Sequence, residues 1–248
     1  ALSAVNSINW ARVVAQVVYY VTAALAAGAP ERKVSFAVPT GNFGCVFAGY
    51  GAAKMGLPID KLIVATNRND ILHRFFQSGG YRMDDVFATQ SPSMDIQIAS
   101  NFERLLFDID GRDGAVVREQ MAALAAQGGF EVTGAALSQA HELFLSHRVD
   151  EAATTATIAE VYRESGLIID PHTAVGLRAA RDLMPQGPVI PLATAHPAKF
   201  PDAVEAACGQ RPVLPDAMAD LYEREERCAV LPNDLGVLQD YVRKLRRA

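Results

Sequence analysis

The chain has 248 residues, of which 50% are hydrophobic and 21% charged, so it can bury a sizeable core, and a disordered protein is excluded. Its 23 Lys and Arg against 28 Asp and Glu give a net charge of -5, which leaves no broad basic surface for nucleic acid. Cys45, Cys208 and Cys228 lie far apart. We therefore expect no disulfide framework, no metal site and a cytoplasmic location.

The first predicted element is a helix from Asn9 to Ala27, where apolar residues recur at three- and four-residue steps. Its apolar stretch is too short and too often interrupted by polar residues to span a membrane, so we expect a buried helix and no membrane partner. Because the sequence opens without Met, a basic segment or a cleavage site, we expect a part of a longer protein.

Two apolar runs come next, Val34 to Val38 and Leu62 to Thr66, with a small-residue helical stretch between them that ends at Met55. This order predicts strand, loop, helix, strand. Because both runs are apolar throughout, they indicate an α/β fold with a parallel sheet covered by helices on both faces.

A second αβ block is predicted further along the chain, from the run Gly166 to Ile169, the helix Thr173 to Leu183 and the run Val189 to Thr194. Between the two blocks the pattern is helical, with segments at Gly114 to Gln127 and Leu137 to His147. The sequence therefore predicts a helical insertion between two halves of one sheet.

These patterns divide the chain into four segments. We expect a first αβ block in residues 1–83, a mainly helical insertion in 84–150, a second αβ block of the same domain in 151–208, and a C-terminal extension in 209–248.

The loop PTGNFG, from Pro39 to Gly44, follows a predicted strand and precedes a helix. We expect Gly41 and Gly44 to take positive φ and to let the first amides of the helix face an anion such as a phosphate. The loop lacks the GK[ST] and GxGxxG patterns of nucleotide sites. The alternative, nearly as strong on spacing alone, is a tight turn whose glycines serve only geometry.

A second candidate anion site lies in NSINWAR at the start of the first helix. Asn6 and Ser7 can cap the helix and offer polar donors, and Arg12 can reach the same end as a bidentate partner. Plain N-capping with a surface arginine is the favoured alternative on these residues alone.

The segment TAHPAKF follows the last apolar run. Ligands of open α/β sheets bind at the carboxyl ends of strands, so the Thr194 hydroxyl is a candidate partner for a ring nitrogen of a cofactor. For His196 a helix-capping or core role, and for Lys199 a place on a helix surface, are favoured over catalysis.

Five segments in this order resemble bacterial and fungal-type threonine synthases: NSINWAR, PTGNFG, SPSMDIQIASNFERLLF, DPHTAVG and TAHPAKF. The resemblance implies the tryptophan-synthase-β-like fold of pyridoxal phosphate enzymes (fold type II) and the cofactor pyridoxal 5'-phosphate. It also implies a lyase of threonine biosynthesis, which converts O-phospho-L-homoserine and water to L-threonine and phosphate.

The resemblance assigns roles residue by residue. Gly41, Asn42, Phe43 and Gly44 match the loop that holds the cofactor phosphate, and Thr194 matches the hydroxyl that meets the pyridine nitrogen. The residues that match the substrate-phosphate site of related enzymes are Asn6, Ser7 and Arg12.

Two positions depart from the family. Cys45 stands where the loop usually continues with Asp. No lysine here matches the family's Schiff-base lysine, which lies in an N-terminal segment, so we expect that catalytic lysine outside this chain. The alternatives are a threonine-synthase-like phospholyase, a serine/threonine dehydratase of the same fold, and a non-catalytic fragment that binds a phosphorylated metabolite. The residues leave the oligomeric state open.

Overall fold

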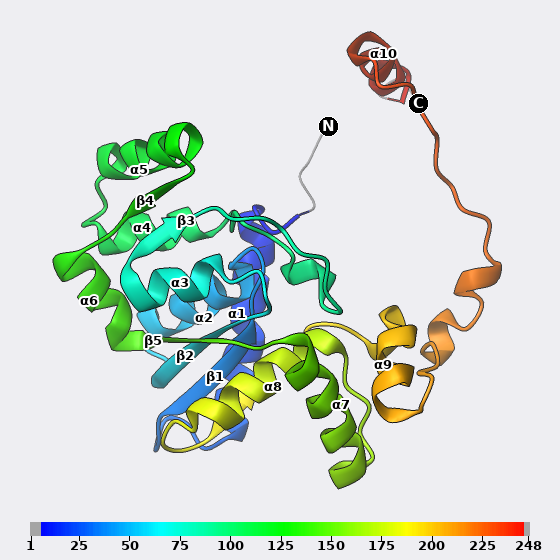
Figure 1. The fold of residues 1–248 in the computed structure, drawn as a ribbon, viewed down its shortest axis with the longest axis horizontal. Coiled ribbons are helices and arrows are strands. Elements are labelled where there is room, and N and C mark those ends of the chain that lie inside the picture. The colour runs from blue at the N-terminus through cyan, green and yellow to red at the C-terminus, as the bar shows by residue number, and fades with distance from the viewer. Residues whose placement is uncertain (1–5, 246–248) are drawn as a thin grey trace. The chain divides into compact units, whose positions relative to one another are not determined.

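The computed structural model describes residues 6–245, which belong to two units, drawn in Figure 1. The larger unit is Asn6–Pro212, and the smaller one includes residues 213–245. The ends of the first and fourth predicted segments, residues 1–5 and 246–248, lie outside the described range. Within that range no helix is long and apolar enough to cross a membrane.

The larger unit alternates helices and strands. Its helices are α1 (Trp10–Ala26), α2 (Gly44–Lys54), α3 (Ile71–Ser78), α4 (Phe102–Ile109), α5 (Gly114–Gln127), α6 (Gly134–Leu143), α7 (Glu151–Ser165), α8 (Pro171–Leu183) and α9 (Pro201–Cys208), with 3-10 helices η1 (Pro92–Met94) and η2 (Pro197–Lys199). Its strands are β1 (Val34–Pro39), β2 (Ile59–Thr66), β3 (Gly80–Arg82), β4 (Gly129–Glu131), β5 (Phe144–Arg148) and β6 (Val189–Pro191).

Four of these strands form one parallel sheet in the order β5-β2-β1-β6. β1 and β2 pair from Val34 with Ile59 to Pro39 with Ala65. Strands β3 and β4 pair antiparallel in a separate ribbon. Because all four sheet strands run the same way, their carboxyl ends meet at one edge, where ligands of such sheets bind.

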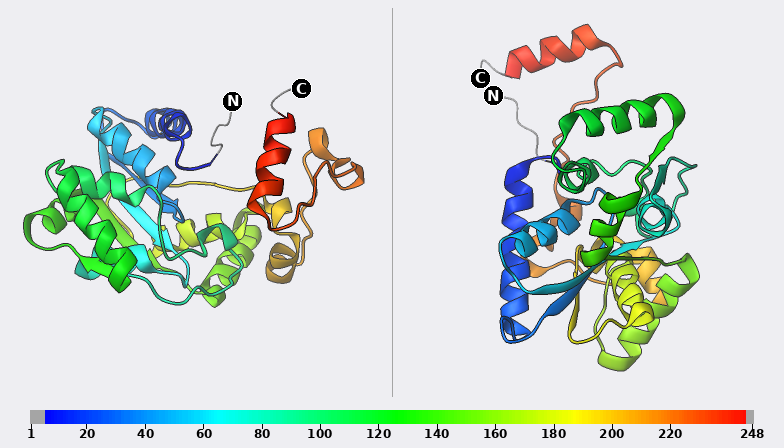
Figure 2. Two further views of the ribbon diagram at one scale, coloured as in Figure 1. Left: turned by 90° about the horizontal axis from the view of Figure 1, so that it is seen from above. Right: turned by 90° about the vertical axis from the view of Figure 1, so that its left-hand side faces the viewer.

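The two faces of the sheet carry different helices, and Figure 2 shows α1 and α8 on opposite sides of it. Phe36 and Val38 are buried in a core cluster with residues of α1 and α2, whereas Ala37 and Ile63 are buried with Val175 of α8. Both faces are therefore apolar, which explains the uninterrupted hydrophobic run of each strand. The predicted parallel sheet with helices on both faces is confirmed.

Two predicted segments were wrong. The helix expected over Leu137 to His147 ends at Leu143, and the chain continues as β5, where Phe144 and Ser146 alternate with less buried neighbours along an edge of the sheet. The strand expected over Gly166 to Ile169 does not form. Gly166 ends α7 in a left-handed conformation, and Leu167 is 64% exposed, so this run has no sheet to join.

The other predicted elements agree with the structure, which places α5 at the predicted residues Gly114–Gln127. The division of the chain into four segments stays a prediction, although β5, from segment 84–150, pairs with β2 of the first block.

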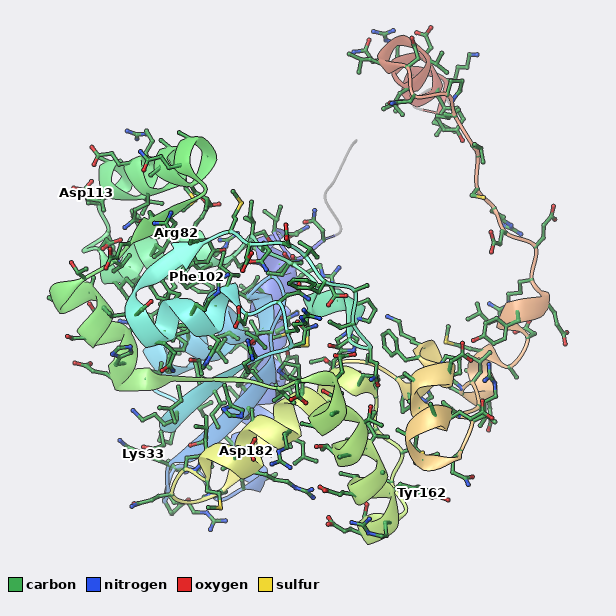
Figure 3. The ribbon with its side chains drawn as sticks, viewed as in Figure 1. Lys33, Arg82, Phe102, Asp113, Tyr162 and Asp182 are labelled. Carbon is green, nitrogen blue, oxygen red and sulfur yellow. The ribbon has the colours of Figure 1, made fainter. Side chains whose placement is uncertain are left out.

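Aromatic side chains fill the core between α2, α3, α4 and β5. Phe102, labelled in Figure 3, lies 4.7 Å from Phe75, 5.0 Å from Tyr81 and 5.3 Å from Phe43, measured between ring centroids. Phe43 also lies 6.1 Å from Phe144. Edge-to-face and stacked pairs of this kind add to the burial energy of each ring, so they hold the start of α2 firmly against the neighbouring helices.

The sequence predicted a buried helix for α1, but the structure buries it on one face only. Val13, Tyr20 and Ala24 lie in the core, whereas Val14 and Val18 on the opposite face are exposed, Val18 by 63%. The smaller unit contains η3 (Asp216–Met218), η4 (Leu221–Glu223) and α10 (Leu235–Leu245). Its ion pairs are local, such as Arg224 with Asp220.

Candidate functional site

The glycine loop (Pro39–Gly44) leaves the carboxyl end of β1 and enters α2. The positive φ falls on Phe43, with φ 61° and ψ 5°, and not on Gly41 or Gly44, where the sequence predicted it. Phe43 is almost completely buried, and its ring packs in the aromatic core. Packing of the side chain therefore offsets a backbone conformation that ordinary residues rarely adopt.

The two glycines of the loop serve different purposes. A Cβ on Gly41 would lie 2.3 Å from the carbonyl oxygen of Ser93, so only glycine lets the segment around Ser93 approach. A Cβ on Gly44 would lie 3.5 Å from Asn101 Nδ2 and 3.6 Å from Ser7 Cβ, which are ordinary contacts. Gly41 is therefore the position where a side chain is excluded.

The amides of the loop point to an anion site. Among residues 6–245, no acceptor is found for the backbone N–H groups from Gly41 to Gly44, and α2 has no side-chain cap. Thr40 N–H, by contrast, donates to Ala65 O at 2.8 Å. Consecutive unpaired amides at the positive end of a helix dipole bind phosphate well. This geometry is therefore consistent with the prediction that the loop binds an anion.

The second predicted anion segment lies beside the first. Asn101 Nδ2 donates to the carbonyl oxygens of both Ser7 and Asn42, at 3.0 Å each, and Ser7 Oγ lies 3.4 Å from Ser100 Oγ. The expected N-cap was wrong: Asn9 caps α1 through Ala11 N–H. Asn6 Oδ1 instead accepts from Ile8 N–H, which closes a local turn ahead of the helix.

Arg12 is exposed, and its charge acts on Cys45 in the first turn of α2. Burial raises the pKa of the Cys45 thiol, while a hydrogen bond with Tyr19 and the positive charge of Arg12 oppose that rise. Ser7 thus lies beside the glycine loop through Asn101, and Arg12 lies near Cys45, while the oxyanion site of Asn6, Ser7 and Arg12 stays a prediction.

Thr194 and Cys45 line one cavity of about 440 Å³, together with residues of α1 and of the chain after β6: Gln16, Tyr19, Ala23, Pro191, Leu192 and Ala193. Thr194 lies three residues beyond the end of β6 and is exposed. Gln16 Oε1 is buried and has no hydrogen-bond partner among residues 6–245. Burial raises the pKa of Tyr19 well above its ordinary value, so the phenol and the thiol are both neutral at pH 7.

This cavity fits pyridoxal phosphate by its chemistry. The hydroxyl of Thr194 offers a donor for a ring nitrogen. Separately, the oxygen of Gln16 lacks a donor among the described residues, so the cavity has an unsatisfied polar group. Cys45 lines this cavity and directly follows Gly44, the last residue of the glycine loop, so the cavity and the unpaired amides of the loop are adjacent.

Sequence reasoning missed a buried pair in the segment DPHTAVG. His172 Nδ1 lies 2.8 Å from Asp170 Oδ1, and His172 Nε2 accepts from Ser93 N–H at 3.2 Å. The carbonyl of Ser93 lies against Gly41. Because His172 bonds the N–H of the same residue, the pair helps to position the segment that packs against the glycine loop. The spacing of Asp170 and His172 around a proline at the start of α8 is the only signal of it in the sequence.

The two remaining candidates in TAHPAKF have the structural roles that the sequence favoured. His196 caps η2, accepting from Ala198 N–H at 3.2 Å. Lys199 is exposed, with its Nζ 5.9 Å from the ring of Phe200.

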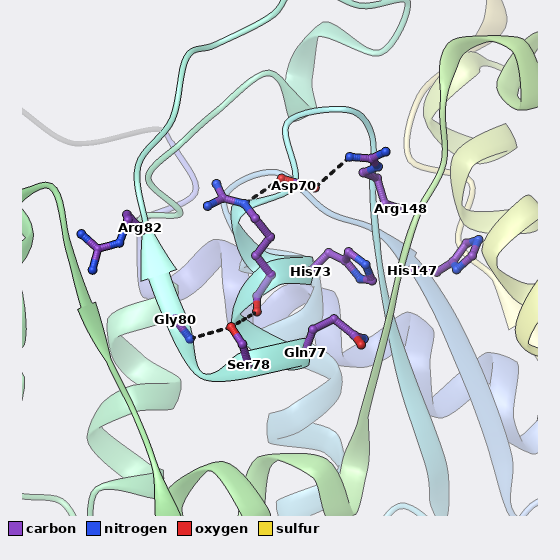
Figure 4. Close-up of a pocket in the computed structure, with 9 residues that line it drawn as sticks. Asp70, His73, Gln77, Ser78, Gly80, Arg82, His147 and Arg148 are labelled. Carbon is purple, nitrogen blue, oxygen red and sulfur yellow. Dashed lines mark hydrogen bonds and ion pairs between the residues drawn. The ribbon is translucent and has the colours of Figure 1, made fainter.

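A larger cleft of about 600 Å³ lies beside α3 and β5, and we call it the Asp70 cleft (Figure 4). Asp70 accepts from Arg74 at 2.9 Å and from Arg148 at 3.3 Å. His73 Nδ1 lies 3.0 Å from Ser146 Oγ. None of the predicted site residues lines this cleft. Across residues 6–245 there is also no group of three or more side chains of the metal-binding types placed to share an ion.

Comparison with known proteins gives consistent matches. The family model "Threonine synthase, C-terminal" matches residues 173–242. A threonine synthase of Pseudomonas aeruginosa is 57% identical over 97% of this chain and 52% of its own length. One of Saccharomyces cerevisiae is 44% identical over 89% of this chain and 48% of its own length. The chain thus spans about half the length of the curated relatives it matches.

Solved structures agree with the sequence matches. A threonine synthase of Brucella melitensis, described as bound to pyridoxal phosphate, superposes with a TM-score of 0.95 and 55% identity, over all of this chain and 53% of that one. The yeast enzyme gives 0.90 and 40%, over 99% and 54%. The fold class expected from the resemblance is confirmed.

Proposed function

Because this chain belongs to the threonine synthase family, we propose that it supplies the phosphate-binding part of a pyridoxal phosphate-dependent lyase of threonine biosynthesis in the cytoplasm. The enzyme would convert O-phospho-L-homoserine and water to L-threonine and phosphate. The observation that carries the proposal is the row of amides from Gly41 to Gly44, which are unpaired among residues 6–245 and which Asn101 joins to the segment of Asn6 and Ser7.

Each residue of the site has a separate task in this proposal. The amides of Gly41, Asn42, Phe43 and Gly44 bind the cofactor phosphate, and the Thr194 hydroxyl hydrogen-bonds to the pyridine nitrogen. Asn6, Ser7 and Arg12 hold the phosphate of the substrate. They would also compensate the negative charge that develops on this phosphate when its bond to the substrate carbon breaks. When bound, the cofactor supplies an electron sink for negative charge at the substrate carbons.

The base is proposed to come from outside this chain. Within residues 6–245 no lysine lines the cavity of Thr194 and Cys45. Lys54 pairs with Asp108, Lys61 donates to Glu142 O, and Lys199 is exposed. The proposal therefore assigns binding and orientation to these residues, and proton transfer to a lysine on another segment.

The test is the product formed by the intact protein with pyridoxal phosphate and O-phospho-L-homoserine. Phosphate and L-threonine in equal amounts support the proposal. Phosphate release with a different carbon product indicates a phospholyase, and deamination of serine or threonine without phosphate indicates a dehydratase. Absence of any turnover with saturable phosphate binding supports a non-catalytic binding module.

An Arg12→Ala variant separates these outcomes further. Substrates without a phosphate do not need this guanidinium, so a dehydratase keeps its rate in the variant, whereas a threonine synthase loses phosphate release.

A further inference from the structure

Asn101 joins the two predicted anion segments, which lie far apart in the sequence. It is completely buried at the start of α4. Its side chain does not cap that helix, although asparagine often does so at this position. The Nδ2 group donates instead to Ser7 O and to Asn42 O, 94 and 59 residues away along the chain.

The carboxamide and its neighbours form a continuous set of bonds. Asn101 N–H is a second donor to Asn42 O, at 3.1 Å, and Asn101 Oδ1 accepts from Arg104 Nε, also at 3.1 Å. Arg104 Nη2 in turn donates to Ile8 O at 2.9 Å. Asn101, at the N-cap of α4, and Arg104, within α4, thus hydrogen-bond to the carbonyls of both segments.

The donor count of this side chain explains why asparagine stands here. Its NH₂ group has two hydrogens, and the two carbonyl oxygens use both of them. Aspartate has the same shape but no donor, and alanine or serine cannot reach both oxygens. A buried carbonyl that loses its donor is destabilised. Loss of the Asn101 side chain would therefore free Ser7 O, while Asn42 O would keep the backbone N–H of residue 101, so the link between the two segments would be cut at Ser7.

We propose that Asn101 is a positioning residue that couples the substrate-phosphate segment to the cofactor-phosphate loop. This inference rests on the proposed function for the identity of the two anions, while the coupling itself rests on the hydrogen bonds alone. Tightening of the loop around one phosphate is transmitted through the shared NH₂ group to Ser7 and the turn that precedes α1.

The experiment follows amide hydrogen exchange in the intact protein, in peptides that cover residues 6–13 and 41–47. Three variants are compared with the parent: Asn101→Ala, the milder Asn101→Ser, and Asn69→Ala as the matched control. Asn69 is also a buried carboxamide, but it bonds Asn67, Phe87 and Asp95 and touches neither segment.

Without cofactor, both Asn101 variants should exchange residues 6–13 roughly tenfold faster than the parent, the factor expected for one lost hydrogen bond. Asn69→Ala should leave this segment unchanged even where it lowers the melting temperature. Exchange at 6–13 equal to the parent's in Asn101→Ser or Asn101→Ala overturns the proposal, and so does equally faster exchange in Asn69→Ala.

Pyridoxal phosphate provides the second readout. In the parent and in Asn69→Ala, the cofactor should slow exchange at 6–13 as well as at 41–47, whereas in the Asn101 variants any slowing should stay at 41–47. Slowing at 6–13 that persists without Asn101 contradicts the coupling. No slowing at 41–47 in the parent contradicts the proposed function instead, and leaves the cofactor-free comparison as the test of the coupling.

Discussion

The two cavities at the sheet differ in a way that size does not reveal. The Asp70 cleft is the larger, but several of its polar groups are paired, since Asp70 accepts from two arginines and His73 is paired with Ser146. The cavity of Thr194 and Cys45 is smaller and contains the oxygen of Gln16, which has no partner among the described residues, and it lies next to the unpaired amides of Gly41 to Gly44. Buried polar groups are nearly always paired in folded proteins, so the unsatisfied groups indicate where a ligand belongs.

The largest expected effect is at Gly41. Gly41→Ala places a Cβ against the carbonyl of Ser93, so the loop must move, and we expect cofactor affinity to fall by about 100-fold or more, since a clash with backbone costs several kcal/mol. Gly51→Ala is the matched control, because nothing lies within 4 Å of its Cβ in α2. Equilibrium titration with pyridoxal phosphate measures both. Equal affinities in the two variants would contradict the assignment of the loop.

Arg12→Ala should have the next largest effect. Loss of a charged hydrogen bond to the substrate phosphate costs about 2 to 4 kcal/mol in kcat/KM, while cofactor affinity stays unchanged. Arg148→Ala, in the Asp70 cleft, also removes an exposed arginine and should leave kcat/KM unaltered. If Arg148→Ala is the more damaging of the two, the Asp70 cleft takes part in the reaction. Loss of cofactor from Arg12→Ala would assign this guanidinium to the other phosphate.

Gly44→Ala should have only a small effect. Its φ is not positive, and a Cβ would make ordinary contacts with Asn101 and Ser7, so we expect cofactor affinity to change by less than about tenfold, which is 1.4 kcal/mol. Fluorescence titration alongside Gly41→Ala provides the comparison. A loss as large as that of Gly41→Ala would restore the conformational requirement that the sequence suggested for Gly44.

The smallest effect concerns the pH dependence of the Asp70 cleft. Burial lowers the pKa of His73; Asp70 opposes the shift, and His147 and Arg148 add to it. The folded protein therefore binds this proton less readily than the unfolded chain. The contribution of His73 to stability is fully present above the ordinary pKa of about 6.5 and decreases as the pH falls below it. Urea unfolding at pH values between 8 and 5 should show that the free energy of unfolding falls less steeply with decreasing pH for His73→Gln than for the parent. Identical slopes would contradict the assignment.

Local patterns in the sequence predicted most of the helices and strands of the larger unit. Continuous apolar runs identified β1 and β2, because strands covered on both faces leave no polar position. The edge strand β5 was missed because its alternation covers only five residues directly after a helix, where Phe144 continues the helical pattern. The strand predicted from Gly166 to Ile169 was wrong for another reason: the segment is apolar, but among residues 6–245 no strand lies beside it to pair with.

The candidate site was predicted in parts. Glycine spacing located the loop between β1 and α2, but it assigned the positive φ to glycines, whereas packing places it on Phe43. The roles of Asn101 and His172 depend on partners more than 50 residues away, and no local pattern encodes such contacts. Their segments entered the prediction only through family resemblance, without a role for either side chain.

The most direct test of the central claim is an NMR titration of the intact protein, labelled with ¹⁵N-glycine, with pyridoxal phosphate. Gly41 and Gly44 report on the anion loop, and Gly80 lines the Asp70 cleft, so one spectrum observes both regions. The account predicts that the resonances of Gly41 and Gly44 shift on addition of the cofactor, whereas that of Gly80 does not. A shift of Gly80 with Gly41 and Gly44 unchanged would place the phosphate in the other cleft and contradict the account.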